Sequence, residues 1–380
     1  MLQRLGTLDA FPPAANYTYM DAASVALMHK QASDAINAWQ LALARDGTVA
    51  FDEQAEVEVL GKLSRAAAGL FNAREQDIAV ASSETVLMAS LAWAVSPPRG
   101  STIVATDVCH PSTIYPWMRV AEHTGAKMRW VKASNYHVDC DELAAAIDDT
   151  TAVVCLSHVE YGTGQTYDLK RFADLAHRRG AILAVDVTQS AGQVPIDVEA
   201  TGIDAAACSL YKWLCGPFGV GFMYVAPQLQ KLKPGIVGWR SHEDMWDFQA
   251  DRIRFPETAK RYEFGTMAYG CALGAAIAVE YLLGLTVTAI HDHNRKIADR
   301  LRQGLEEQGG QILSPESSEE RSAIVAARFP GRDSTALVKS LHESNVVLSK
   351  RRDFLRFSPH LYNDSGDVES ALNAIAAALR

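Results

Sequence analysis

Two side chains in the middle of the chain could together support covalent catalysis. Asp186 lies near the end of the apolar run AILAVDV, and Lys212 follows 26 residues later, between Tyr211 and Trp213. Burial lowers the pKa of a lysine amine and frees it for Schiff-base chemistry. A carboxylate at the carboxyl end of a strand must be paired or face a cleft, because burying an isolated charge is costly. Each residue alone is more often structural, as a helix cap, an ion-pair partner or a surface lysine.

A candidate anion site lies earlier in the chain. Ser82 and Ser83 precede the apolar run VLMASLAWAV, which has the composition of a buried helix. The first backbone N–H groups of a helix and its dipole favour a bound anion. Ser83, Glu84 (through its N–H) and Thr85 are therefore candidate ligands of a phosphate. An ordinary helix cap is the alternative, and for this motif alone it is the more frequent one.

The pattern of apolar runs predicts how these residues are positioned. Expected strands alternate with amphipathic helices, which favours a mainly parallel sheet covered by helices. The expected strands are 101–106, 127–131, 151–156 and 181–187, and the expected helices are 112–125, 139–148 and 168–179.

The pattern of expected elements changes after about residue 290. There, expected helices at 291–308, 334–344 and 367–379 alternate with expected strands at 323–329 and 346–348. We expect a large domain at 1–285 and a small α+β domain at 286–380. The segment 1–18 is a candidate to pack with the small domain.

Composition excludes several other classes. The chain has 380 residues, of which 48% are hydrophobic and 21% charged, and this is typical of globular proteins. Its net charge of −9 argues against nucleic-acid binding. The six cysteines form no CxxC pair and show no zinc spacing, so we expect reduced thiols, no metal and a cytoplasmic protein. The apolar stretch 270–290 carries Glu280, which favours a buried helix over a membrane span.

The order Asp-x-x-Gln, then Ser-x-Lys before a glycine-rich turn, resembles the class V aminotransferase superfamily. These are fold-type-I enzymes that depend on pyridoxal 5'-phosphate (PLP), and they include cysteine desulfurases, selenocysteine lyases, kynureninases and isopenicillin-N-epimerase-like proteins. The resemblance extends to YMDAAS at 19–24, SSET at 82–85, CHPSTIYPW at 109–117, YEFGT at 262–266 and LRFSPHLYND at 355–364. It implies an α/β large domain, with a mainly parallel sheet of the seven-stranded type between helices, and a smaller α+β domain.

The resemblance also implies roles for single residues. Lys212 would hold PLP as the internal aldimine and then act as the general base at Cα, where a carbanion forms. Asp186 would keep the ring nitrogen protonated, and His110 would stack on the ring. The remaining cofactor ligands would be Gln189 and His158 near the phenolate oxygen and Ser83, Glu84, Thr85, Ser209 and Tyr211 at the phosphate.

Substrate and partner contacts follow from the same resemblance. Arg356 would pair with the α-carboxylate of a small amino acid, because a guanidinium binds a carboxylate through two hydrogen bonds. Ala23 and His158 would lie on the substrate side. Gly265 and Thr266 would reach the phosphate of the neighbouring subunit, which implies a homodimer. The sequence leaves open whether the loop 238–248 shapes the pocket.

The reaction branch is less constrained than the cofactor. We expect a class V aminotransferase-like transaminase or an amino-acid lyase. An epimerase and a kynureninase-like hydrolase are alternatives, although His110 replaces the Phe of kynureninases. A cysteine desulfurase ranks last, because residues 347–353 (VLSKRRD) lack the nucleophilic cysteine.

Two interpretations from other classes find less support in the sequence. A nucleotide-binding oxidoreductase would need a GxGxxG after an early strand, and the chain has none. A non-catalytic binding protein on the same fold has no chemical need for both Asp186 and Lys212.

Overall fold

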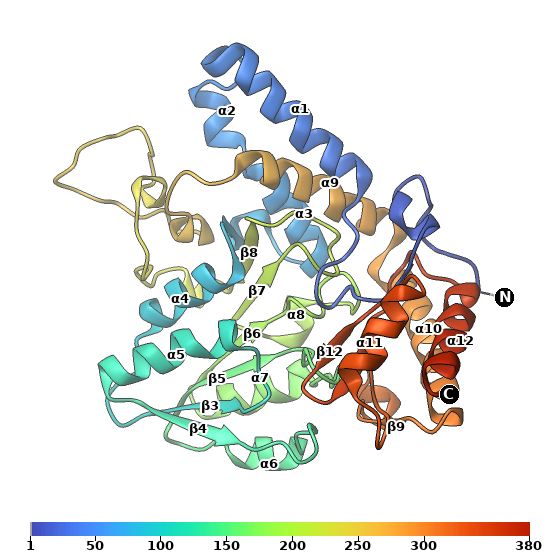
Figure 1. The fold of residues 1–380 in the computed structure, drawn as a ribbon. Helices are drawn as coiled ribbons and strands as arrows, with labels where there is room; N and C mark the ends of the chain where they lie inside the picture. The colour runs from blue at the N-terminus through green and yellow to red at the C-terminus, as the bar shows by residue number, and fades with distance from the viewer. Residues whose placement is uncertain (1) are drawn as a thin grey trace.

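The computed structural model describes residues 2–380, and a seven-stranded sheet forms its centre (Figure 1). The strand order is β2-β8-β7-β6-β5-β3-β4. The strands are β2 (Ile78–Ala81), β3 (Thr102–Thr106), β4 (Lys127–Val131), β5 (Thr151–Ser157), β6 (Ile182–Asp186), β7 (Ala205–Ser209) and β8 (Gly221–Val225).

Most neighbours in this sheet are parallel, as the sequence predicts. The pairs β4–β3, β3–β5, β5–β6 and β6–β7 are parallel, whereas β8 runs antiparallel to both β7 and β2. A parallel sheet with helices on both faces needs apolar side chains on both sides of each strand. The strands β2, β3 and β8 are accordingly buried along their whole length.

Helices cover the two faces of the sheet with separate apolar cores. One core joins α3 (Gly61–Phe71), α7 (Leu169–Arg178) and α9 (Tyr269–Leu285) to one face. The other joins α4 (Glu84–Val95) and α5 (Pro111–Thr124) to the opposite face. The remaining helices of this part are α1 (Lys30–Asp46), α2 (Glu53–Glu58), α6 (Cys140–Ala145) and α8 (Val198–Thr201).

The C-terminal part has a core and a sheet of its own. Four antiparallel strands run in the order β12-β13-β10-β9, where β9 is Gln311–Ile312, β10 is Val325–Arg328, β12 is Ser349–Arg351 and β13 is Phe354–Phe357. The helices α10 (Val287–Glu307), α11 (Ser334–Glu343) and α12 (Ser365–Ala378) pack in the same apolar core.

The start of the chain lies against this C-terminal part. Strand β1 (Thr18–Tyr19) pairs in parallel with β11 (Val346–Val347). The backbone N–H of Leu5 donates to the carbonyl of Leu361, and Arg4 forms ion pairs with Asp364 and Asp367. Both termini therefore lie on the same side of the molecule (Figure 1). The domain boundaries at 285 and 286 stay a prediction.

The elements that the sequence predicts lie within a few residues of those in the structure, whereas α1, α2, α3, β2 and β8 were not predicted. The helix expected at 291–308 begins earlier, at Val287, because the Thr286 side chain caps the N–H of Ala289. The apolar stretch 270–290 forms α9 and the first turn of α10, which meet at an angle of 78°.

Two sequence expectations concern membranes and cysteines. Within residues 2–380 no single helix is long and apolar enough to cross a membrane, and the bent pair of α9 and α10 meets the length and composition criteria only when both are taken together. All six cysteines are free thiols, and four of them are buried.

Candidate active site

A small cavity lies where the carboxyl ends of the parallel strands meet. Its volume is about 120 Å³. Ligand sites of open α/β sheets occupy this edge, because loops from several strands converge there. The cavity is lined by Ser83, Glu84, Thr85, His110, Ser112, Ser157, Tyr161, Asp186, Thr188, Gln189, Ser209, Tyr211 and Lys212. Most side chains that the sequence predicts for the cofactor therefore share one site.

Asp186 is held by two donors at the end of β6. The Thr113 hydroxyl of α5 donates to Oδ2 at 2.6 Å, and the backbone N–H of Thr188 donates to Oδ1 at 2.8 Å. The neighbouring strand β5 places Ser157 in register with Asp186. These contacts fix both carboxylate oxygens of a nearly buried side chain at the cavity.

Lys212 brings a buried amine into the same cavity from the loop after β7. Its side chain is 9% exposed, and burial lowers the pKa of the amine to about 8, an effect that the nearby Asp186 carboxylate partly offsets. Among the described residues the amine has neither a hydrogen bond nor an ion pair, and it lies 5.6 Å from the centre of the Tyr211 ring. An amine with a lowered pKa and no partner is suited to attack an aldehyde.

The N-terminus of α4 forms another wall of the cavity. The Ser83 hydroxyl caps this helix by accepting from the N–H of Val86 at 3.3 Å. The helix cap and the anion site are therefore compatible, because the same turn also lines the cavity. Gly221 of β8 permits this arrangement, since a Cβ there would stand 2.7 Å from the nitrogen of Glu84.

The Glu84 side chain lies in the cavity as well, which sequence reasoning did not anticipate. It is buried, its Oε2 accepts from the Thr85 hydroxyl at 3.2 Å, and its Oε1 has no partner within residues 2–380. Burial raises the pKa of this carboxyl well above its usual value, and the charge of Asp186 adds to the effect.

His110 lines the cavity and also caps a helix. It is the N-cap of α5, where Nδ1 accepts from the N–H of Ser112 at 3.2 Å, and its ring also lines the cavity. The ring meets the Tyr161 ring edge-on, with centroids 5.2 Å apart. Burial, followed by the nearby Lys212, lowers the pKa of the imidazole.

Gln189 faces the cavity, but two other contacts hold its amide. Nε2 donates to the carbonyl of Ala23 at 3.0 Å, and Oε1 accepts from the indole N–H of Trp213 at 2.8 Å. One N–H of the amide is left for a ligand. Ala23 thus touches the site through its carbonyl and is not among the residues that line the cavity.

His158 lies outside the lining of the cavity, so its contact with the cofactor stays a prediction. Its side chain is buried and is absent from the cavity lining, and burial lowers the pKa of its imidazole to about 4. Tyr161, three residues later, lines the cavity. The chain bends between the two residues, where the bridge between Val159 and Thr166 begins a turn after β5. The sequence around His158 predicts a loop after the strand but does not predict the direction of each side chain in it.

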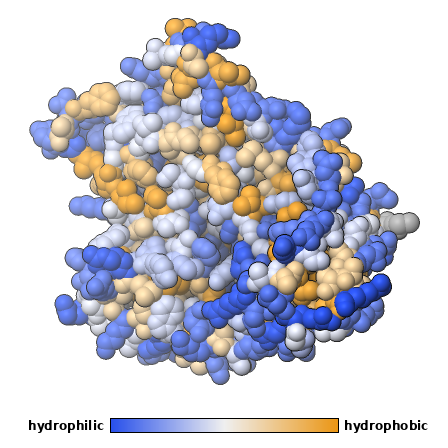
Figure 2. Space-filling model, viewed as in Figure 1, coloured by the Kyte–Doolittle hydropathy of each residue, from blue (hydrophilic) through white to orange (hydrophobic). Residues whose placement is uncertain are grey.

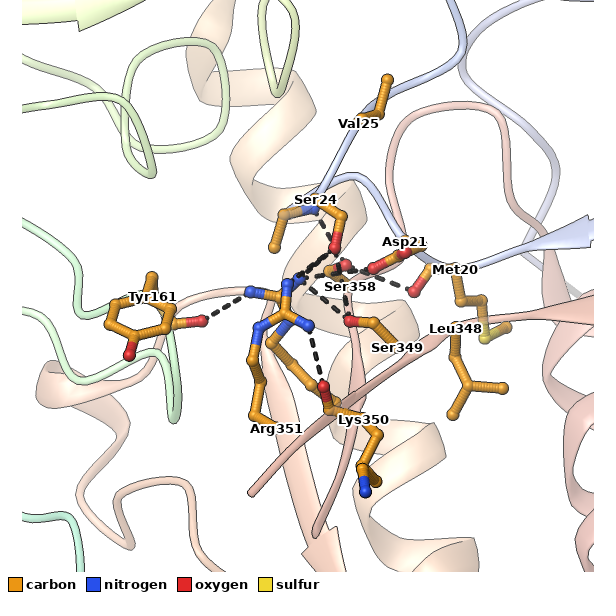
Figure 3. A network of polar contacts seen from close by, with 12 residues as sticks. Met20, Asp21, Ser24, Val25, Tyr161, Leu348, Ser349, Lys350, Arg351 and Ser358 are labelled. Carbon is orange, nitrogen blue, oxygen red and sulfur yellow. Dashed lines mark hydrogen bonds and ion pairs between the residues drawn. The ribbon is translucent and has the colours of Figure 1, made fainter. Parts of the chain in front are cut away.

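Arg356 contacts Tyr161, which lines the cavity, and several further polar residues. Figure 3 shows its partners Ser24, Tyr161 and Ser349. Its side chain is fully buried, and it donates to the Tyr161 carbonyl at 2.8 Å, to Ser349 Oγ at 3.0 Å, to Ser24 Oγ and to Asp21. Burial lowers the pKa of the guanidinium to about 10. Arg356 is not among the residues that line the cavity, so a carboxylate would have to replace part of this network.

Gly265 and Thr266 are not among the residues that line the cavity of their own chain. Gly265 is close to the Trp239 indole, since a Cβ added to this glycine would stand 3.8 Å from Nε1. The loop 238–248 lines two other hollows of the surface, of about 200 and 370 Å³. Within this chain the loop does not shape the cavity that contains Lys212.

The fold and this site together define a class of enzyme. The chain matches the family Aminotransferase class-V over residues 18–370, and it belongs to that family. An uncharacterized aminotransferase of Bacillus subtilis, YcbU, is 26% identical over 97% of this chain and 96% of its own length. A probable cysteine desulfurase of Pyrococcus abyssi is 25% identical over 81% of this chain and 80% of its own.

Solved structures agree with this family. A lysine-to-alanine variant of C-DES, with glycine covalently linked to the PLP cofactor, has a TM-score of 0.89 and 25% identity over 98% of this chain and 99% of its own. A complex of the cystine C-S lyase C-DES with cysteine persulfide has a TM-score of 0.87 at the same identity, over 96% of this chain and 99% of its own. The protein is a fold-type-I enzyme that depends on PLP.

The residues of the cavity fit that cofactor. The unpartnered Lys212 amine suits its aldehyde, the carboxylate of Asp186 suits its pyridinium nitrogen, and the N–H groups of the turn at Ser83 suit its phosphate. When bound, PLP accepts the electron pair released at Cα of an amino acid. The positions of single cofactor ligands stay predictions.

Proposed function

We propose that this protein is an amino-acid lyase that eliminates a leaving group from Cβ of a small amino acid. One cavity contains both the Asp186 carboxylate and the Lys212 amine, which has no hydrogen bond or ion pair among the described residues, and no cysteine lines this cavity. This observation carries the proposal. Elimination requires a base that removes the Cα proton and a protonated ring nitrogen. Lys212 supplies the base, and Asp186 holds the proton of the ring nitrogen.

The absence of a cysteine from the cavity lining separates this proposal from a persulfide mechanism. The stretch 347–353 contains no cysteine, and the buried thiols Cys155 and Cys208 have pKa values raised well above normal by burial. A thiolate is needed to form an enzyme-bound persulfide. The likeness to C-DES, described as a cystine C-S lyase, supports direct elimination as the alternative to that route.

Transamination is the second candidate. YcbU, described as an aminotransferase, matches nearly the full length of this chain, which favours this candidate. Lys212 would take the Cα proton in either route, and in transamination it would hold that proton for delivery to the bound cofactor. An epimerase or a kynureninase-like hydrolase would use the same lysine, and the assay below distinguishes all four.

We assign the remaining roles as follows. The turn of Ser83 and Thr85 binds the phosphate, together with Ser209 and Tyr211. His110 packs on the cofactor ring, and its lowered pKa favours the neutral imidazole. Arg356 receives the α-carboxylate after exchanging one of its present partners.

We also propose a homodimer in which Gly265 and Thr266 act in the neighbouring subunit. Apolar side chains are exposed on the long loop after β8, at Val237, Phe248 and Ile253, and at the end of α1, at Leu41 and Val49. Figure 2 shows apolar surface on the protruding side of the molecule that carries this loop. Patches of this kind mark protein interfaces. Light scattering should give twice the 41.3 kDa chain mass, and a monomer that retains full activity would contradict the proposal.

The decisive experiment is one panel of amino acids scored for five readouts. The holoenzyme is incubated with β-chloroalanine, cystine, alanine and kynurenine, and pyruvate, ammonia, amino transfer to a keto acid, α-proton exchange and release of alanine from kynurenine are followed in parallel. Lyase activity predicts pyruvate and ammonia in equal amounts from β-chloroalanine. Amino transfer without ammonia would support the transaminase instead. Borohydride should abolish the visible absorption band and label Lys212, and a label on another lysine would refute the site.

A further inference from the structure

A second and larger cavity lies beside the one that contains Lys212. Its volume is about 260 Å³, and its lining includes Tyr136, Glu160, Tyr161, Arg351, Arg352 and Phe354. Tyr161 lines both cavities, so they are adjacent. The roles assigned above leave this space unused.

Hydrogen bonds connect the two cavities through the arginines. Arg356 donates to the carbonyl of Tyr161, and Ser24 accepts from both Arg356 and Arg351, the latter at 2.9 Å. Figure 3 shows Arg351, Ser24 and Tyr161 around the same network. An amino acid with its α-carboxylate at Arg356 would therefore have Arg351 within reach of its side chain.

The hairpin between β12 and β13 places the cationic groups of this cavity. Arg352 occupies its turn with φ +48°, a left-handed conformation that favours glycine. The Arg352 guanidinium lies 5.3 Å from the centre of the Tyr136 ring, and its neighbour Asp353 pairs with Arg328 at 2.7 Å. A charged side chain is thus kept at a strained position at the edge of a cavity, which is where strain commonly has a functional reason.

The acidic residues of the cavity do not neutralise both arginines. Asp107 accepts from the N–H of Ala133 at 2.8 Å and pairs with Lys132 at 3.5 Å. Glu160 is buried, and its Oε1 accepts from Thr106 at 3.1 Å and Tyr167 at 3.0 Å. Burial raises the pKa of Glu160 to about 7, so near neutral pH part of its population is uncharged. Within residues 2–380 neither Arg351 nor Arg352 forms an ion pair.

We propose that this second cavity binds a carboxylate on the substrate side chain, and that Arg351 selects amino acids that carry one. The inference rests on the proposed function, because the amino group of the substrate must reach the cavity of Lys212. The substrate class is then an amino acid whose Cβ substituent ends in an acid, including dicarboxylic amino acids and thioethers or disulfides with a distal carboxylate. A guanidinium binds such a group through charge-assisted hydrogen bonds.

The test compares acids with amides of the same size. Dissociation constants of aspartate, asparagine, glutamate, glutamine and alanine are measured from the change in the visible absorption of the holoenzyme. The wild-type protein should bind one acid roughly tenfold or more tightly than its amide. Arg351→Gln should abolish this preference and leave alanine binding within about twofold. Arg351→Lys should restore part of the preference for the acid. The control for loss of charge is Arg300→Gln, because Arg300 is exposed and pairs with Glu369 on α12.

Three outcomes would overturn the inference. The wild-type protein could show no preference for any acid over its amide, the preference could survive in Arg351→Gln, or alanine binding could weaken as much as glutamate binding. The third result would make Arg351 a ligand of the α-carboxylate. Elimination from β-chloroalanine, which has no distal acid, is measured on the same samples. If the wild-type protein does not catalyse elimination from β-chloroalanine, the proposed lyase function is refuted, whereas the selectivity of Arg351 is not.

Discussion

The Thr113 hydroxyl donates to Oδ2 of Asp186 across 2.6 Å, so a side chain of α5 orients a carboxylate at the end of β6. The second oxygen is held by the N–H of Thr188. The carboxylate is therefore positioned before any ligand enters, as electrostatic stabilisation of a cation requires.

Replacing Asp186 by Asn should remove the charge that keeps the ring nitrogen protonated. We expect kcat to fall by about 100-fold or more, because one preorganised electrostatic partner is lost. Thr113→Val keeps the charge and removes one donor, so its loss should be clearly smaller. Steady-state kinetics with β-chloroalanine measure both variants, and equal losses would show that Asp186 acts only through its hydrogen bond to Thr113.

Lys212→Met should stabilise the cofactor-free protein. The pKa of this amine is lowered from 10.5 to about 8 in the folded chain, so the unfolded chain binds the proton more readily between these pH values. The penalty is therefore complete below pH 8 and disappears as the pH rises to 10.5. At pH 7 the variant should gain up to about 3 kcal/mol in the free energy of unfolding.

Urea unfolding at pH 7 and pH 10 measures this effect, and Lys339→Met on the exposed face of α11 is the control. The gain should shrink between the two pH values in Lys212→Met only. A gain that does not depend on pH would mean that packing, and not the buried charge, explains it.

Gly221→Ala should weaken both folding and cofactor binding. A methyl group at this position of β8 would stand 2.7 Å from the backbone of Ser83 and Glu84, so the turn at the start of α4 must shift. Overpacking of this kind costs about 1–3 kcal/mol. Thermal unfolding and PLP titration give the two readouts.

The matched control is Gly284→Ala in α9, where nothing lies within 4 Å of an added Cβ. This change should stabilise the helix by up to about 1 kcal/mol. If Gly221→Ala lowered stability but left the PLP affinity unchanged, the turn would not be a phosphate site.

Arg356→Lys should separate substrate binding from cofactor binding. Lysine keeps the positive charge but cannot form the paired hydrogen bonds of a guanidinium, so we expect KM for β-chloroalanine to rise about tenfold or more, with PLP retained. Ser349→Ala, which removes one neutral acceptor from Arg356, should raise KM much less. Release of PLP from Arg356→Lys would show that the residue supports the whole site instead of binding the carboxylate.

The sequence predicts the parallel part of the sheet and several residues that share one cavity, because both depend on local patterns. Buried strands such as β5 are continuous apolar runs, and Asp186 and Lys212 follow such runs directly. The pairing of Thr18 with Val346 has no local signal, since it joins the two ends of the chain. The direction of a side chain in an irregular loop is equally hidden, and the sequence did not predict that Tyr161 lines the cavity.

The pairing of β1 with β11 also affects how the enzyme is made. Ala23 and Ser24 reach the site from the first tenth of the chain, whereas Ser349 and Arg356 come from its last tenth. A nascent polypeptide cannot assemble this pocket until Arg356 has been translated. Catalytic competence should therefore appear only after Arg356 has left the ribosome, and removal of the segment with Ala23 and Ser24 or of the segment with Ser349 and Arg356 should abolish it.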